Sequence, residues 1–305
     1  MSRSTPDPEV LFVGGTGRSG STLLAGLIGD LPGAVDAGEI RFLWQRGLLE
    51  RRLCACGVRV PECPFWSAVL TRAYPRGLPD PDAVHAALTR RTRLRRVPVW
   101  LWRAAPPDPG LLGQILPSLY AAIAATAGAR VVVDNSKLPT YAALLATVLP
   151  APPRVVHLVR DPRAAAYSWM HVTRLPDGGP ALVMEQRGVL RSALLWTVWN
   201  GVLEALWRGR PGYLRVTYEG LADDPAAVVA GIAAHAGLTT PPQARPPSAL
   251  SHAVAGNPHR LQRRRVIIRR DDRWRRGLGR PAGLAVSLLA LPLLRRYGYP
   301  VRPPR

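Results

Sequence analysis

Four glycines lie close together near the amino terminus, in the segment VLFVGGTGRSGSTLL at residues 10–24. Glycines tolerate positive φ and let a bound group approach the backbone closely. The apolar run at 10–13 predicts a buried strand, and Ser21 and Thr22 begin a helical pattern whose first N–H groups attract anions. The order of strand, loop and helix predicts a phosphate-binding loop. Its expected ligand-contacting residues are Gly15, Thr16, Gly17, Arg18, Ser19, Gly20, Ser21 and Thr22.

The cation of this loop is an arginine. In nucleotide triphosphatases with this glycine spacing, lysine follows the second glycine and contacts the β- and γ-phosphates. Here Ser21 follows Gly20, and the basic residue is Arg18, inside the loop. The pattern therefore favours phosphate binding over ATP hydrolysis, with an ordinary tight turn as the alternative interpretation.

A second segment, VVHLVRDPRAAAYS at 155–168, has the same design. An apolar strand ends at Arg160, Asp161 and Pro162 begin a helix, and Ser168 follows about two turns later. An arginine at a strand end and a hydroxyl on the next helix can bind one isolated phosphate. Two phosphate sites indicate a nucleotide phosphorylated at two places. The alternative is that Arg160 pairs with Asp161 or caps a neighbouring element.

These residues resemble the sulfotransferases that use 3′-phosphoadenosine 5′-phosphosulfate. GTGRSGSTLL is similar to their 5′-phosphosulfate loop and LVRDPRAAAYS to their 3′-phosphate site. The bacterial and tyrosylprotein-type branch is the most similar, because arginine replaces the loop lysine of the cytosolic enzymes. Further similar segments are AGEIRFLW at 37–44, VVVDNSK at 131–137, YEGLADDP at 218–225 and GNPHR at 256–260.

The resemblance implies a role for each motif. Glu39 matches the general base, and Lys137 matches the residue that stabilises the leaving group together with Arg18. Arg160 and Ser168 would bind the 3′-phosphate, and Arg260 would belong to a basic C-terminal lid. Sulfuryl transfer by such parts needs no metal, so we assign none.

Two of these residues also have simpler interpretations. Glu39 could be a surface carboxylate paired with Arg41 or Arg46. Lys137 is the only lysine among 41 lysine and arginine residues, which suggests that position 137 requires an ammonium group, although chance could also preserve one lysine.

Two other function classes remain open. The apolar run ending at Asp134 also resembles a magnesium-binding strand, which would make the protein a P-loop kinase or triphosphatase that uses Mg-ATP. The net charge of +21 could instead serve binding to nucleic acid or an anionic membrane. The sequence shows no recognised nucleic-acid-binding motif, so we expect no specific nucleic-acid binding. Attraction to an acidic acceptor or to lipid headgroups stays open.

Three cysteines cluster in CACGVRVPEC. Cys54, Cys56 and Cys63 are one ligand short of a closed structural zinc site, and no histidine lies nearby in the sequence. His85 could complete such a site only through the fold. A local disulfide or three buried thiols are the other interpretations.

We expect one α/β domain over residues 1–305, a three-layer P-loop-type fold with a mostly parallel sheet and helices on both faces. Strands are predicted near 10–13, 130–134, 155–159 and 213–217, with a short strand after Gly33. Residues 45–128 predict a helical insertion on the acceptor side, with a helix-compatible stretch at 90–96 and a helix that Pro117 interrupts early. Residues 251–280 predict the basic cofactor lid.

The ends of the chain bear on localisation. No signal peptide is recognisable, so we expect a cytoplasmic protein, with peripheral attachment to the membrane as an open alternative. The apolar stretch at 283–294 is too short to span a bilayer and predicts a terminal core helix or a membrane-surface helix. The acceptor is not encoded in any motif: a carbohydrate, a glycolipid, a natural product or a tyrosine would suit a glutamate base. The oligomeric state cannot be read either.

Overall fold

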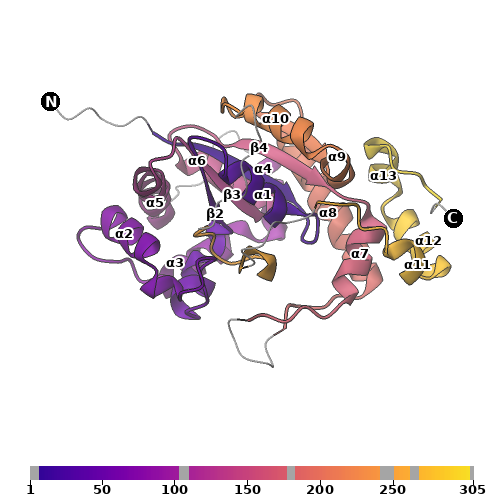
Figure 1. Cartoon of the computed structure of the whole chain (residues 1–305), viewed down its shortest axis with the longest axis horizontal. Helices are drawn as coiled ribbons and strands as arrows, with labels where there is room; N and C mark the ends of the chain where they lie inside the picture. The colour runs from indigo at the N-terminus through magenta and orange to yellow at the C-terminus, as the bar shows by residue number, and fades with distance from the viewer. Residues whose placement is uncertain (1–6, 103–109, 177–182, 241–250, 262–267, 303–305) are drawn as a thin grey trace.

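The sheet at the centre of the molecule is parallel (Figure 1). The computed structural model describes residues 7–102, 110–176, 183–240, 251–261 and 268–302. Its five strands have the order β2-β3-β1-β4-β5. They are β1 (Glu9–Gly15), β2 (Ala34–Gly38), β3 (Val131–Lys137), β4 (Arg154–Val159) and β5 (Tyr213–Thr217). All five predicted strands are confirmed within two or three residues at their ends.

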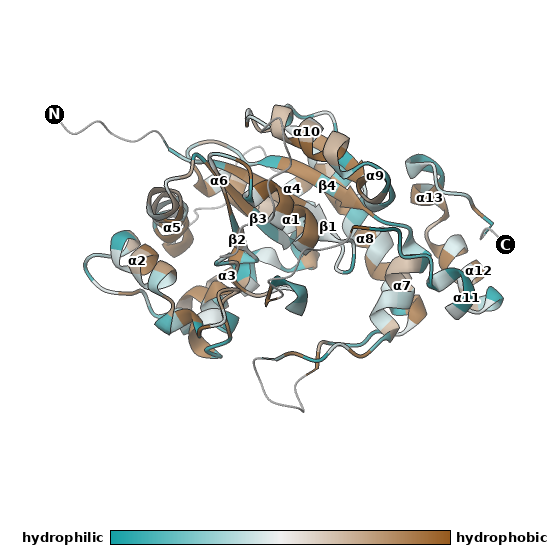
Figure 2. Cartoon of the chain, viewed as in Figure 1, coloured by the Kyte–Doolittle hydropathy of each residue, from teal (hydrophilic) through white to brown (hydrophobic). Residues whose placement is uncertain are grey.

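Helices cover both faces of the sheet because the strand residues alternate between two apolar cores (Figure 2). Leu11 and Val13 of β1 pack with α1 (Ser21–Gly29), α9 (Tyr218–Asp223) and α10 (Pro225–His235). Val10 and Phe12 face the opposite core. That core is completed by α5 (Leu111–Ala127), α6 (Pro139–Val148) and α8 (Val189–Trp207). The expected three-layer α/β fold is confirmed.

The described chain between β2 and β3 consists mainly of helices joined by loops and contains one isolated antiparallel bridge, between Leu53 and Arg59. It contains short 3₁₀ turns and a π-helix at Leu43–Leu49, followed by α2 (Pro64–Ala73), α3 (Pro81–Thr92), α4 (Val97–Trp102) and α5. The 3₁₀ turns are Ile40–Phe42, Val60–Glu62 and Leu94–Arg96.

Two local predictions in this region are wrong. The stretch 90–96 is not one helix, because α3 ends at Thr92 and Arg93 is extended, with φ −60° and ψ 136°. Pro117 does not interrupt α5, which continues through it to Ala127. Pro117 cannot donate a hydrogen bond to the carbonyl of Gly113, four residues earlier. The apolar side of α5 is nevertheless anchored in the core by Leu116, Leu119 and Tyr120. This tertiary packing outweighs the local cost of the proline.

The C-terminal residues pack beside α7 (Pro162–Met170) and α8, at the right of Figure 1. They form α11 (Trp274–Gly277), α12 (Arg280–Leu289) and α13 (Leu291–Tyr297), whereas the 3₁₀ turn at Pro258–Leu261 that precedes them contacts α1. Ala290 and Leu294 are buried against Ala165 and Trp196, which agrees with a terminal core segment at 283–294. None of the described helices is long and apolar enough to cross a membrane.

Candidate functional site

The phosphate-binding loop predicted from the glycines lies between β1 and α1. Gly15 ends β1 with φ +134°, and Gly20 is the N-cap of α1 with φ +93°. A Cβ atom on Gly20 would lie 2.6 Å from Cδ2 of Tyr218. No side chain caps the first N–H groups of α1. The sequence therefore folds here into a loop whose backbone donors and helix terminus face one place, the geometry expected of an anion site.

Several polar atoms of the loop have no protein partner. Thr16 Oγ1, Ser19 Oγ and Arg18 Nε are buried and form no hydrogen bond with any described residue. A protein normally satisfies such groups. A loop with more donors than protein acceptors fits a ligand that contributes oxygen atoms, and the phosphosulfate expected from the sequence is such a group.

Arg18 lies in a cluster of like charge. Its φ is +67°, one guanidinium nitrogen donates to Thr173 Oγ1 at 3.1 Å, and the group lies over the Trp169 ring. Burial, together with the nearby charges of Arg160 and Arg187, lowers the pKa of Arg18. Three guanidinium groups that repel one another around a loop of free donors create a positive field suited to a polyanion.

Arg160 lies at the end of β4, as predicted, and is almost fully buried. It donates to the backbone carbonyl of Arg18 at 2.9 Å and to Asp271 at 3.1 Å, and its guanidinium lies over the Tyr218 ring. Hydrogen bonds from Arg273, with help from Arg160, lower the pKa of Asp271 to about 2. The second arginine site is therefore linked directly to the first loop and to the C-terminal lid.

The side chain of Asp161 pairs with Arg163 and not with Arg160. Its carboxylate accepts hydrogen bonds from the backbone and guanidinium of Arg163, at 2.6–2.9 Å. Arg163 is fully buried and lies over the Trp274 ring. The alternative that Arg160 pairs with Asp161 is therefore not realised, because Arg163 takes that carboxylate.

Glu39 and Lys137 form an ion pair, although 98 residues separate them in the sequence. Lys137 lies at the end of β3 with φ +68° and also donates to the carbonyl of Asn135 at 3.0 Å. Glu39 is 5% exposed, and its other carboxylate oxygen lies 3.8 Å from Arg46. The predicted base and the predicted leaving-group cation thus come from neighbouring strands and touch. Glu39 is therefore not a surface carboxylate, although the pairing with Arg46 that was considered for it is present.

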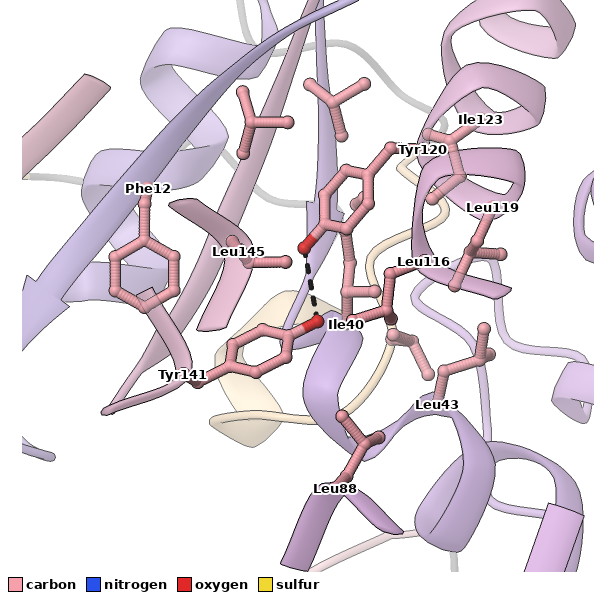
Figure 3. Close-up of a cluster of buried hydrophobic side chains, with 14 of the residues drawn as sticks. Phe12, Ile40, Leu43, Leu88, Leu116, Leu119, Tyr120, Ile123, Tyr141 and Leu145 are labelled. Atoms are coloured by element: carbon pink, nitrogen blue, oxygen red, sulfur yellow. Dashed lines mark hydrogen bonds between the residues drawn. The ribbon is translucent and has the colours of Figure 1, made fainter. Parts of the chain in front are cut away.

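The backbone around Glu39 is fixed from two sides. Its N–H donates to the carbonyl of Val254 at 2.8 Å, in an isolated parallel bridge to the C-terminal segment. On the other side, Ile40 and Leu43 enter the apolar cluster of Figure 3, where Tyr120 and Tyr141 are joined by a hydrogen bond. The contacts of its backbone and of the residues that follow it therefore hold Glu39 in one position.

Asp134, the candidate magnesium ligand, is fully buried and satisfied by protein groups. Its carboxylate accepts hydrogen bonds from Tyr120 at 2.5 Å and from the backbone N–H and hydroxyl of Ser136. Burial raises the pKa of Asp134 to about 6. These contacts make Asp134 a structural anchor below the site, which does not favour a role in metal binding.

One cleft of about 1750 Å³ joins these groups. The predicted site residues that line it are Gly17, Arg18, Gly20, Ser21, Thr22, Glu39, Lys137, Arg160, Ser168 and Arg260. Gly15, Thr16 and Ser19 lie in the loop behind this surface. Arg260 donates to the carbonyl of Leu53 at 2.8 Å, so it also joins the C-terminal segment to the insertion.

The segment predicted as a C-terminal lid divides into two described parts with different neighbours. Gly256, in GNPHR, borders Glu39, because a Cβ there would lie 3.0 Å from Glu39 Oε1. Asp271 instead meets Arg160. Of the two described parts, the later one therefore lies at the expected 3′-phosphate site. Residues 262–267 of the predicted lid lie outside the described residues.

Sequence reasoning missed several cleft residues. Thr173 and Arg187 reach Arg18 and its stacking ring from the segment after α7, where no motif marks them. Asp36 of β2 also lines the cleft, and burial raises its pKa to about 7 although it accepts a hydrogen bond from the Gly38 N–H. Asp36 lies one strand away from Lys137 because β2 is the neighbour of β3 in the sheet. The order of strands in a sheet cannot be read from a single sequence.

Comparisons with known proteins agree with this geometry. A family model described as the sulfotransferase family matches residues 8–242. The sulfotransferase domain from the olefin synthase of Synechococcus PCC 7002 is 21% identical, with a TM-score of 0.56 and coverage of 98% of both chains. The sulfotransferase domain from the curacin biosynthetic pathway is 17% identical, with a TM-score of 0.56 and coverage of 96% of this chain and 98% of that one. A search of curated proteins finds no significant match.

Proposed function

Because the chain belongs to the sulfotransferase family, we propose that it transfers a sulfuryl group from 3′-phosphoadenosine 5′-phosphosulfate to an acceptor hydroxyl, with Glu39 as general base. One observation carries this proposal. The glycine loop, Arg160 and the Glu39–Lys137 pair line a single cleft, so two phosphate sites and an acid–base pair address the same bound molecule.

The residues fit the co-substrate. The backbone donors of residues 15–22 and the Arg18 guanidinium would hold the 5′-phosphosulfate, since no side chain caps the start of α1 and Thr16 Oγ1, Ser19 Oγ and Arg18 Nε have no partner among the described residues. Arg160 and Ser168 would hold the 3′-phosphate. The Arg160 guanidinium is paired with the carboxylate of Asp271. We therefore infer that the phosphate either binds this guanidinium together with Asp271 or takes the place of Asp271 on it. When bound, the co-substrate supplies the sulfuryl group and the bridging oxygen from which that group departs.

The chemistry of the chain's own residues then follows from their contacts. Glu39 accepts the proton of the acceptor hydroxyl as the hydroxyl oxygen bonds to sulfur. Lys137 has three donors, and its described contacts to Glu39 and Asn135 account for two. We infer that the Lys137 ammonium group lies beside the departing oxygen and stabilises its negative charge, while its contact with Glu39 keeps that side chain in position. Arg18, which lines the same cleft, would stabilise the same developing charge.

The acceptor would enter beside Glu39. There the cleft is lined by Phe42, Arg46 and Phe65, an arrangement of rings and positive charge. The Arg46 guanidinium lies 4.0 Å from the Phe42 ring centroid. This surface suits an acceptor with an apolar body and a hydroxyl, and a negatively charged group on it would be attracted to Arg46. A carbohydrate, a glycolipid, a natural product and a tyrosine all remain acceptors to be tested.

The rival proposal, Mg-ATP chemistry, has less support. It requires Asp134 to bind magnesium, but this side chain is fully buried and occupied by Tyr120 and Ser136. The loop also lacks the lysine that contacts the γ-phosphate. Direct binding to nucleic acid or an anionic membrane rests only on net charge.

Thermal stabilisation tests the cofactor assignment without an acceptor. A ligand that binds only the native state raises the melting temperature. We expect adenosine 3′,5′-bisphosphate to stabilise the protein without magnesium, and ATP with magnesium to stabilise it less at equal concentration. Stabilisation by ATP with magnesium alone would refute the sulfotransferase proposal and return attention to Asp134.

A further inference from the structure

A second cluster of chemically capable side chains lies on the acceptor side of the molecule. Cys54, Cys56 and Cys63 converge there with His252, which lies 189 residues beyond Cys63. The sulfur atoms and one ring nitrogen all lie within 4.8 Å of one another. His85, which could have completed the group, is not part of it. None of the three cysteines forms a disulfide, so the local disulfide considered from the sequence is not present.

The distances match the edges of a metal tetrahedron. Cys56 Sγ lies 3.6 Å from Cys63 Sγ, and Cys63 Sγ lies 3.7 Å from Cys54 Sγ. His252 Nδ1 lies 3.3 Å from Cys63 Sγ and 3.8 Å from Cys54 Sγ. Zinc bonds of about 2.3 Å to sulfur and 2.0–2.1 Å to nitrogen give edges of about 3.8 Å between sulfurs and about 3.6 Å between sulfur and nitrogen. Four of the six edges are therefore close to those of a zinc tetrahedron, and the other two are no longer than 4.8 Å.

The local backbone supports such a site. Residues 53–59 form a tight loop in which Gly57, with φ +91°, donates to the carbonyl of Cys54 at 2.9 Å. Cys63 is the N-cap of α2. The His252 ring stacks on Phe65 with centroids 4.7 Å apart, and the His252 carbonyl accepts a hydrogen bond from Trp66 at 2.8 Å. Outer contacts of this kind fix the orientation of metal ligands.

We propose that Cys54, Cys56, Cys63 and His252 bind one Zn²⁺ ion in a closed structural site. Three thiolates and an imidazole in tetrahedral spacing suit zinc, whereas a two-iron cluster needs its ligands spread over two metal atoms. Because all four positions are protein ligands, the ion has no open position for catalysis. Binding releases the thiol protons and uses the neutral imidazole.

The site has a consequence for the cleft. It joins the insertion, through Cys54 and Cys63, to the C-terminal segment that begins at His252. Two residues later Val254 accepts the hydrogen bond of the Glu39 N–H, and Gly256 borders the Glu39 carboxylate. The ion would therefore hold the segment that forms one wall around the proposed base, at a point where Ala55 also donates to the Ala253 carbonyl at 3.1 Å.

The first test is metal analysis of the full chain purified under reducing conditions from zinc-supplemented medium. We expect about one zinc per chain, removed by a strong chelator with a fall in melting temperature that added zinc reverses. Cobalt reconstitution should give the absorption of a tetrahedral thiolate site. Wild-type protein with less than about 0.1 zinc per chain and no cobalt spectrum would overturn the proposal. A disulfide among the three cysteines in the intact mass would also overturn it.

Variants then assign the ligands. His252→Ala and Cys56→Ser should lower zinc content at least tenfold, whereas the matched control His85→Ala should keep it. Cys56 is only half-buried, so its serine variant disturbs the core less than a change at Cys54 or Cys63. Full zinc content in both ligand variants would contradict the assignment. If a variant does not fold, the wild-type stoichiometry and cobalt spectrum still decide the question.

Discussion

The proposed base owes its position to contacts made by distant residues. Glu39 meets Lys137 and Arg46 through its carboxylate, and its backbone is held by Val254. Each contact comes from a different segment, so together they define both where the carboxylate lies and which charges face it. Lys137 is also the only lysine of the chain. A flexible ammonium group can contact Glu39 and a departing oxygen in turn, which a planar guanidinium does less readily.

Replacement of the carboxylate tests the role of Glu39. Glu39→Gln keeps the size of the side chain but removes the proton acceptor, so sulfuryl transfer should fall by about 10²–10⁴-fold. Binding of adenosine 3′,5′-bisphosphate should change little. The measurement is bisphosphate release with an acceptor found by screening, and calorimetry checks binding.

The matched control is Glu185→Gln, because Glu185 lines the same cleft but is exposed and paired with Arg187. Its transfer rate should stay near the wild-type value. Equal rates in Glu39→Gln and wild type would remove Glu39 from the chemistry.

Candidate site residues could be proposed from the sequence at this scale, but their partners could not. Arg18, Glu39, Lys137 and Arg160 stand in motifs with recognisable spacing, and the structure brings them into one cleft. The pairing of Arg160 with Asp271 was not predictable, because 111 residues separate them and no pattern links them.

At the scale of elements, parallel strands explain why the motifs meet. β1, β3 and β4 are adjacent, and each carries a motif at its carboxyl end, so the loop, Lys137 and Arg160 share one edge of the sheet. Alternating and continuous apolar runs made the strands predictable.

The prediction that Pro117 interrupts its helix was wrong, because the helix propensity of single residues does not include the packing of α5 against the core.

The junction between β2 and Glu39 gives a stability test. Gly38 has φ +80°, and a Cβ atom there would collide with the backbone of Val254. Gly38→Ala should therefore lower the unfolding free energy by more than about 1 kcal/mol and reduce transfer, because the strain displaces Glu39 or its supporting segment.

Gly231→Ala is the control, since Gly231 lies exposed in α10 with open space around its Cα. This change should raise stability by about 0.4–1 kcal/mol in denaturant titrations. If Gly38→Ala were as stable as wild type, the close approach of the C-terminal segment would be wrong.

A buried histidine joins β4, β5 and α8 and predicts a pH dependence. His157 is fully buried, with Nε2 2.8 Å from Asn200 Oδ1 and Nδ1 2.8 Å from the Tyr213 hydroxyl. Burial lowers the pKa of His157 to about 4, so the unfolded chain binds more protons than the native protein between pH 4 and about 6.5. Stability from this residue is present above about pH 6.5 and falls as the pH drops to 4.

The unfolding free energy should fall by about 3 kcal/mol between pH 6.5 and pH 4, as expected for a pKa shift of this size. It is measured as the unfolding free energy of wild type and His157→Gln at several pH values. The difference between the two proteins should shrink as the pH falls, because the variant has no group to protonate. Parallel curves would contradict this account.

At the scale of the whole molecule, one cleft collects residues from the amino-terminal loop to Arg273. The order of motifs was enough to predict the fold class, since strands alternate with helical segments of crossover length. It could not show that His252 approaches Cys63 or that GNPHR borders Glu39. Such contacts depend on where the C-terminal chain returns, and on its bridge from Val254 to Gly38.

The central claim is that two separate sites bind the two phosphates of one nucleotide. Calorimetry with adenosine 3′,5′-bisphosphate and with adenosine 5′-monophosphate tests it directly, on wild type, Arg160→Ala and Ser168→Ala, with the exposed Arg210→Ala as control. A charge-assisted hydrogen bond contributes about 1.5–3 kcal/mol. Arg160→Ala should therefore weaken bisphosphate binding about 10–150-fold and leave monophosphate binding nearly unchanged. Equal weakening of both ligands, or of neither, would contradict the two-phosphate site.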